Sequence, residues 1–151
     1  MTHLKIGDKA PELNIKDQDG KLHTLANYKG KKIILYFYPK DATPGCTAQA
    51  CNLRDNHESL KKAGYKIIGV SADSENSHLK FIEKQNLNFP LLADTDKELI
   101  KRYGVWGEKK FMGKTYDGIH RTTFIIDGNG TIEDIITKVK TKDHAAQVLS
   151  N

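Results

Sequence analysis

Two cysteines five positions apart, Cys46 and Cys51, are the residues best suited to chemistry. They are the only cysteines among 151 residues, which is too few for a disulfide scaffold. In the reducing cytoplasm, where we expect this protein to reside, a thiol pair is more often catalytic or metal-binding than structural. Cys46 follows a Pro-Gly pair at the expected start of a helix, where unpaired N–H groups and the helix dipole favour a thiolate. The pair therefore predicts thiolate chemistry centred on Cys46.

A helix N-terminus alone does not hold a thiolate at neutral pH. It contributes only ~0.3–1 kcal/mol, or ~2 kcal/mol in favourable geometry. A second cationic or hydrogen-bonding group must therefore lie beside Cys46.

The spacing of the two cysteines limits how they can react with each other. On an ideal helix, five residues turn by ~140° and rise by ~7.5 Å, so the two Cα atoms would lie ~8.6 Å apart. A disulfide requires ~4.4–6.8 Å between these atoms. Cys46 shares a helical face with the apolar residues Ala50, Leu53 and Leu60, whereas Cys51 points elsewhere. We therefore expect two free thiols while the helix is intact, and local unwinding whenever they join.

The elements that position these cysteines alternate between strand-like and helix-like stretches. The stretch 32–38 is apolar without alternation, which indicates a strand buried on both faces. Pro39 ends this strand, and a loop over 41–45 leads into the cysteine helix.

Apolar periodicity and turn residues predict the remaining elements. We expect a hairpin over 13–25, helices over 47–63, 77–85 and 94–103, strands over 65–70 and 89–92, a second hairpin over 121–136, and a helix after Thr141. Residues 107–120 are expected to form a mobile surface loop. This order predicts one α/β domain over residues 1–151, with a central mixed sheet flanked by helices and an N-terminal hairpin.

Composition and charge argue against two classes of partner. The net charge is +5, but the lysines are scattered among acids, and the short clusters at 29–32 and 109–110 are not interleaved with stacking aromatics. The longest uninterrupted apolar run, 33–38, is far shorter than the ~20 residues of a membrane helix. The N-terminus has no hydrophobic stretch typical of a secretory signal. We therefore expect neither a nucleic-acid nor a membrane partner.

The residues around Cys46 resemble a known active-site motif. Pro39, Thr43 and Cys46 form the pattern Pro-x3-Thr-x2-Cys, which is similar to that of the peroxiredoxins. Cys51 and the segment 121–127 resemble the Q-type group of that family, the bacterioferritin comigratory proteins. The segments 7–11 and 104–110 also fit, so the likeness covers nearly the whole chain. It implies a thioredoxin-like fold and a thiol peroxidase without a metal or organic cofactor, which we expect to be a monomer.

The resemblance also implies a reaction for each cysteine. Cys46 would be the peroxidatic residue, whose thiolate attacks hydrogen peroxide or an organic hydroperoxide and becomes a sulfenic acid. Cys51 would be the resolving residue, which condenses with that acid to form an intramolecular disulfide. Thioredoxin would then reduce the disulfide.

Three further residues receive roles from the same resemblance. The Thr43 hydroxyl can accept a proton from the peroxide and donate to the thiolate. Arg121 presents a permanently charged fork of donors, so it can hold the thiolate and steady the peroxide oxygens. Pro39 would shield the thiolate from water. Gln49 occupies a position where many peroxiredoxins carry Glu, so it can bind Arg121 without a full charge.

Two other functions remain as alternatives. One is a metal site formed by Cys46, Cys51 and His57 with His23 or His120 as a fourth ligand, although the spacing is not a familiar zinc pattern. A dithiol oxidoreductase of thioredoxin type is closer in class, but it normally uses Cys-x2-Cys, whose sulfurs meet within one helical turn.

Overall fold

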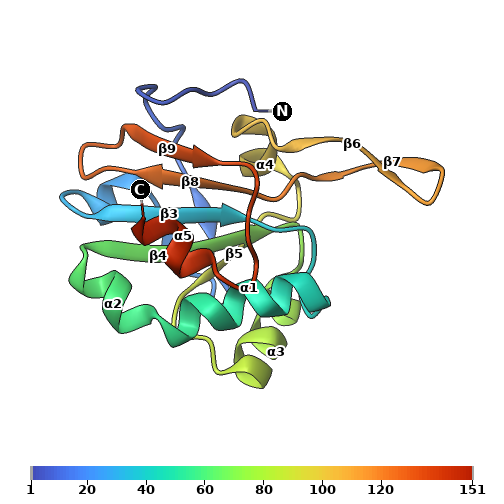
Figure 1. Cartoon of the computed structure of the whole chain (residues 1–151), viewed down its shortest axis with the longest axis horizontal. Coiled ribbons are helices and arrows are strands. Elements are labelled where there is room, and N and C mark those ends of the chain that lie inside the picture. Colours follow the sequence, from blue (N-terminus) through green and yellow to red (C-terminus); the bar gives the residue numbers. More distant parts are fainter. Residues whose placement is uncertain (1, 151) are drawn as a thin grey trace.

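The computed structural model describes residues 2–150 and is built around a five-stranded sheet with helices on both faces (Figure 1). In chain order the elements are β1 (Ile15–Lys16), β2 (Leu22–His23), the 3-10 helix η1 (Leu25–Tyr28), β3 (Lys32–Phe37), α1 (Pro44–Asp55), α2 (His57–Lys62), β4 (Tyr65–Ser71), α3 (Glu75–Gln85), β5 (Leu91–Ala93), α4 (Glu98–Arg102), β6 (Trp106–Phe111), β7 (Lys114–Ile119), β8 (Thr122–Ile126), β9 (Ile132–Ile136) and α5 (His144–Leu149).

The central sheet is mixed, as predicted. Its order is β5-β4-β3-β8-β9. β3 pairs in parallel with β4 and antiparallel with β8, while β9 runs antiparallel to β8. The short strands β1 and β2 pair as the expected N-terminal hairpin. The architecture confirms the predicted α/β class with a thioredoxin-like arrangement of sheet and helices.

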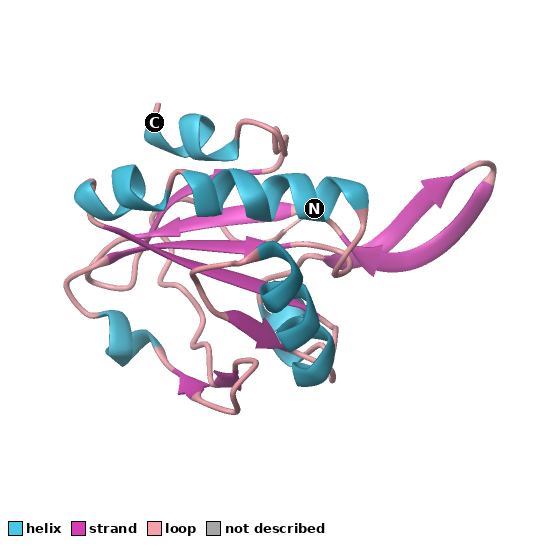
Figure 2. Cartoon of the chain, turned by 90° about the horizontal axis from the view of Figure 1, so that it is seen from below, coloured by secondary structure: helices cyan, strands magenta, loops and turns pink. Residues whose placement is uncertain are grey.

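Strand β3 is buried on both faces, as its apolar run predicted. Ile33, Leu35 and Phe37 join a core with the first residues of the chain and α4. Ile34 and Tyr36 point to the opposite face, where buried residues of α1, α2, α3 and α5 cover the sheet (Figure 2). None of the helices within residues 2–150 is long and apolar enough to cross a membrane.

The predicted helix over 47–63 starts too late and is interrupted, whereas its predicted end agrees with that of α2 to within one residue. α1 begins at Pro44, because Thr43 is extended and Pro is well suited to the first helical position. It ends at Asp55, since Asn56 departs from helical geometry and its side-chain amide donates to the Asn52 carbonyl at 2.8 Å. α2 then continues over a separate segment. Cys46 therefore lies within the first turn of α1.

The expectation of a loop over 107–120 is wrong, although most of this stretch lies at the surface as predicted. Most of this stretch forms the hairpin β6–β7, which projects from the body (Figure 1). Met112 and Gly113 both have positive φ, 51° and 78°, as a tight two-residue hairpin turn requires. Most of its side chains are exposed, so the sequence lacks the alternation by which a half-buried strand is recognised.

Candidate active site

Cys46 lies at the N-terminus of α1 and is almost completely buried. Cys46 is 2% exposed, and it belongs to the same hydrophobic core as Ala50 and Leu53 of its helix. This confirms the predicted helical face. The first helical hydrogen bond runs from the Thr47 N–H to the Thr43 carbonyl at 2.8 Å. The N–H groups of Gly45 and Cys46 therefore precede the helical ladder and direct the positive end of the helix toward the sulfur.

Arg121 provides the second stabilising group beside Cys46. It immediately precedes β8, which pairs antiparallel with β3. In this pairing Thr122, the first residue of β8, lies opposite Phe37, the last residue of β3. This pairing brings a residue distant in sequence to the end of β3 that leads into α1. The Arg121 Nη2 donates to the Cys46 Sγ at 3.3 Å. The structure thus brings together the cysteine and the arginine that the sequence singled out.

Gln49 holds the other branch of the guanidinium. Arg121 Nη1 donates to the Gln49 Oε1 at 2.6 Å, and Gln49 is fully buried. Its amide nitrogen has no hydrogen-bond partner within the described residues. The two bonds of Arg121 leave from different nitrogens, so its planar fork is fixed between the amide and the sulfur.

Thr43 and Pro39 lie on the loop between β3 and α1. The Thr43 hydroxyl donates to the Lys40 carbonyl at 2.9 Å, so its hydrogen is directed toward the loop backbone rather than toward Cys46. Its oxygen retains lone pairs that can accept a hydrogen bond. Pro39 is half-buried and follows the buried Tyr38.

Cys51 faces away from Cys46, as the helical spacing predicted. It is half-buried, and its Sγ donates to the Gln85 Oε1 at the end of α3, at 3.5 Å. Both cysteines are free thiols, and α1 runs unbroken from Pro44 to Asp55. An unbroken helix keeps sulfurs five residues apart from bonding, so Cys51 can reach Cys46 only after α1 unwinds.

Lys109 is a charged neighbour of this site that sequence reasoning missed. It lies on β6, and its Nζ donates to the Ile119 carbonyl at 2.9 Å. Burial and the charge of Arg121 lower the pKa of Lys109 from its ordinary 10.5, while Cys46 acts in the opposite direction. Lys109 therefore lies within electrostatic reach of both. A prediction of strand β6 from the sequence would have suggested that Lys109 lies near Arg121.

The structure does not assemble the alternative metal ligands around the cysteines. Within residues 2–150, the acidic, histidine and cysteine side chains that gather closely enough to share an ion are those of Asp41, Asp73 and His78. Neither cysteine belongs to this group. His57 is instead a half-buried residue at the start of α2.

Comparisons with known proteins agree with this geometry. A family model described as the AhpC/TSA family matches residues 6–135. Peroxiredoxin Bcp of Escherichia coli (strain K12) is 51% identical over 150 residues, which cover 99% of this chain and 96% of the relative. Peroxiredoxin Bcp of Bacillus subtilis (strain 168) is 51% identical over 146 residues, covering 97% and 93%.

Solved structures agree as well. A structure of the bacterioferritin comigratory protein of Xanthomonas campestris, solved to study its alkyl peroxide reduction activity, superposes with a TM-score of 0.87 at 37% identity. The superposition covers 99% of this chain and 96% of that one. The family match and these relatives confirm the predicted family: the chain belongs to the AhpC/TSA family, the peroxiredoxins, which are thiol peroxidases.

Proposed function

We propose that Cys46 is the sulfur that reduces the hydroperoxide and that Arg121 is the residue that activates it. The observation that carries this assignment is the 3.3 Å hydrogen bond from Arg121 to Cys46 at a helix N-terminus. A guanidinium and unpaired backbone N–H groups both stabilise an anionic sulfur. As the sulfur attacks and the peroxide bond lengthens, the same donors stabilise the charge that moves onto the departing oxygen.

The first step oxidises Cys46. Its thiolate attacks the terminal oxygen of the hydroperoxide, the O–O bond breaks, and the other oxygen leaves with a proton as water or alcohol. Cys46 becomes a sulfenic acid. Thr43 supports this step as an acceptor, because its hydrogen is engaged with Lys40 and its oxygen can orient the proton of the peroxide. Pro39, next to Tyr38 on the same loop, limits the access of water to the sulfur.

The second step joins the two cysteines. The Cys51 thiol attacks the Cys46 sulfur, a disulfide forms, and the sulfenic oxygen leaves as water. Because Cys51 faces Gln85 in the reduced protein, this step requires α1 to unwind between the two cysteines. A dithiol of thioredoxin type would then exchange with the disulfide and restore both thiols.

Substrate, assembly and location complete the proposal. Hydrogen peroxide and organic hydroperoxides are both proposed as substrates, and the alkyl peroxide reduction of the Xanthomonas campestris relative supports the second class. We propose that the protein acts as a monomer in the cytoplasm. A chain with two cysteines and no wider disulfide framework is typical of such a reducing compartment.

Thiol counting during stopped-flow reaction with hydrogen peroxide tests these assignments. The native protein should lose two thiols for each peroxide consumed. Cys51→Ser should lose one thiol and accumulate sulfenic acid, and thioredoxin should not sustain its turnover. Full peroxide turnover by Cys46→Ser would overturn the assignment of Cys46, and an unchanged thioredoxin-dependent rate in Cys51→Ser would overturn that of Cys51.

A further inference from the structure

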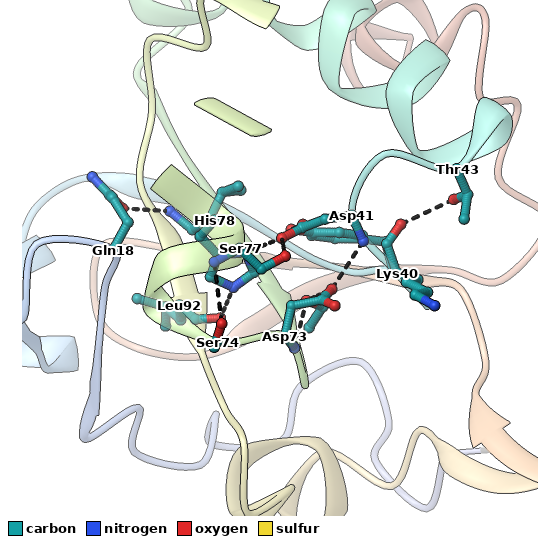
Figure 3. A network of polar contacts seen from close by, with 12 residues as sticks. Gln18, Lys40, Asp41, Thr43, Asp73, Ser74, Ser77, His78 and Leu92 are labelled. Atoms are coloured by element: carbon teal, nitrogen blue, oxygen red, sulfur yellow. Dashed lines mark hydrogen bonds and ion pairs between the residues drawn. The ribbon is translucent and has the colours of Figure 1, made fainter. Parts of the chain in front are cut away.

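The loop that leads from β3 into α1 is tied to helix α3 through Asp41. Asp41 is 7% exposed, and its Oδ1 accepts a hydrogen bond from the Tyr38 hydroxyl. Its Oδ2 accepts from the Ser77 hydroxyl at 2.9 Å and lies 2.7 Å from the His78 Nδ1. Its backbone N–H donates to the Asp73 Oδ2 at 2.9 Å. Figure 3 shows Asp41, Asp73, Ser77 and His78 close together between the loop and α3.

The hydrogen bonds of His78 fix what it presents to Asp41. Its Nε2 lies 2.9 Å from the Leu92 carbonyl, which can only accept, so Nε2 carries a hydrogen. Each oxygen of the Asp41 carboxylate already accepts from a hydroxyl. Burial raises the pKa of Tyr38 well above its ordinary 10.0, so that hydroxyl keeps its hydrogen and remains a donor. The geometry therefore fits a His78 that donates from both ring nitrogens to Leu92 and Asp41.

The loop that Asp41 anchors has a backbone conformation that needs external support. Ala42 has a φ of 64°, in the left-handed region that a residue with a Cβ disfavours. Such conformations persist where the surroundings over-determine them. Asp41 provides that restraint immediately before Ala42, through bonds to both its backbone and its carboxylate. Thr43 follows as the N-cap of α1, and Cys46 lies in the first turn.

We propose that Asp41 and His78 are positioning residues for peroxide reduction: their buried pair clamps the strained loop to α3 and thereby sets the N-terminus of α1 against Arg121. Within residues 2–150, neither residue hydrogen-bonds to Cys46, and both act through the loop. The inference rests on the proposed role of Cys46. It predicts that weakening the clamp slows the reaction of Cys46 with peroxide more than it weakens the fold.

Two substitutions of His78 separate its two hydrogen bonds. His78→Gln places an amide near the Nε2 position, so it retains the bond to Leu92 and loses the bond to Asp41. His78→Asn places an amide near the Nδ1 position and does the reverse. We expect His78→Gln to slow the bimolecular oxidation of Cys46 by about 10- to 100-fold, as small misplacements of a reacting group do. His78→Asn should remain within about threefold of the native rate, because its contact with Asp41 is retained.

A second buried pair of the same kind provides the control. The His23 Nε2 lies 2.7 Å from the Asp17 Oδ2, with both side chains 6% exposed, and the pair belongs to the N-terminal hairpin region rather than the loop. His23→Asn places its amide near the Nδ1 position, so it loses the contact with Asp17 and retains the one with Tyr28. It should lower the melting temperature about as much as His78→Gln and leave the peroxide rate within about twofold of native. Equal slowing by both variants, or a native rate in His78→Gln, would overturn the proposal.

Hydrogen exchange separates this inference from the proposed function. In His78→Gln, the amides of residues 41–47 should exchange faster than in the native protein, while those of β3 and β4 stay protected. This readout does not require that Cys46 react with peroxide. A protein inert to peroxide whose loop is nevertheless loosened by His78→Gln would refute the proposed function and retain the clamp. Unchanged exchange over 41–47 would refute the clamp.

Discussion

Arg121 binds the Cys46 sulfur with one guanidinium nitrogen while the other nitrogen is held by Gln49. The distances are 3.3 Å from Nη2 to Sγ and 2.6 Å from Nη1 to Oε1. Arg121 immediately precedes β8 and the other two residues come from α1, so the contact joins the helix to the sheet at the Cys46 sulfur. Because Gln49 is one helical turn after Cys46, both partners of the fork move together with the first turns of α1.

Replacing Arg121 by lysine should show that the fork, not only its charge, is required. A single ammonium cannot bind the Gln49 oxygen and the Cys46 sulfur from two fixed nitrogens. We expect Arg121→Lys to slow oxidation of Cys46 by about 100-fold, a loss typical of removing one preorganised donor from a reacting centre. Stopped-flow measurement of the second-order rate with hydrogen peroxide tests this. A lysine variant as fast as the native protein would reduce the role of Arg121 to its charge.

Gln49 should influence the oxidation rate of Cys46 through its Oε1, which accepts a hydrogen bond from Arg121, and not through its amide nitrogen. Gln49→Leu removes the partner of Arg121 Nη1 and should lower the same rate by about tenfold, because a charged donor loses a buried acceptor. Gln49→Glu keeps an acceptor, removes the amide N–H that has no partner within residues 2–150, and should preserve the rate within about threefold. The two variants have to be compared at equal folded fraction, checked by circular dichroism. Equal rates in both would contradict the orienting role.

Lys109 should contribute through its charge. Lys109→Met removes a cation within reach of Arg121 and Cys46, and we expect the oxidation rate of Cys46 to fall about threefold at low ionic strength, because positive charge near the site favours the anionic sulfur. Lys109→Arg retains both the charge and a donor toward Ile119, so it should remain close to native. Identical rates in Lys109→Met and Lys109→Arg would show that the lysine only ties the hairpin to the body.

The burial of His144 predicts that the folding stability of the protein depends on pH. It begins α5 and is fully buried. Its Nδ1 lies 2.9 Å from the Gln147 Oε1, which only accepts, and its Nε2 lies 2.8 Å from the Thr123 hydroxyl. A neutral ring satisfies both partners, with Nδ1 donating and Nε2 accepting. Burial lowers the pKa of His144 below its ordinary 6.5.

The sign of the effect follows from proton uptake. As the pH falls below about 6.5, the unfolded chain protonates this ring before the folded protein does, so His144 contributes a loss of folding stability toward acid. Urea unfolding at pH 7.5 and pH 5.5 measures it. The stability lost between these two values should be smaller in His144→Asn, which has no titrating ring. An equal loss in the two proteins would show that His144 does not titrate as described.

The features that the sequence predicted are those carried by local patterns. The apolar run of β3, the turn residues of the β8–β9 hairpin and the cysteine spacing each depend on neighbouring residues, and each is confirmed. Pairing Arg121 with Cys46 required the family motif, because no local pattern links residues so far apart in the chain. Strand pairing between β3 and β8 provides the physical link.

The features that were missed depend on surroundings that the sequence does not display. The hairpin β6–β7 has few buried side chains, so its strands lack an apolar signal. The break at Asn56 comes from a side chain competing with the helix backbone. In the sequence, Asp41 is an acidic residue in a predicted loop and His78 is a histidine in a predicted helix. Their contact at 2.7 Å forms only because α3 packs beside the loop.

Peptide mass spectrometry with hydrogen exchange, applied to the protein after one equivalent of hydrogen peroxide, tests the central claim most directly. The account predicts a chain lighter by two hydrogen atoms, Cys46 and Cys51 joined in one cross-linked peptide, and fast exchange over the first turns of α1. An unmodified Cys46, or a joined pair with the helix from Pro44 to Asp55 still protected, would contradict it.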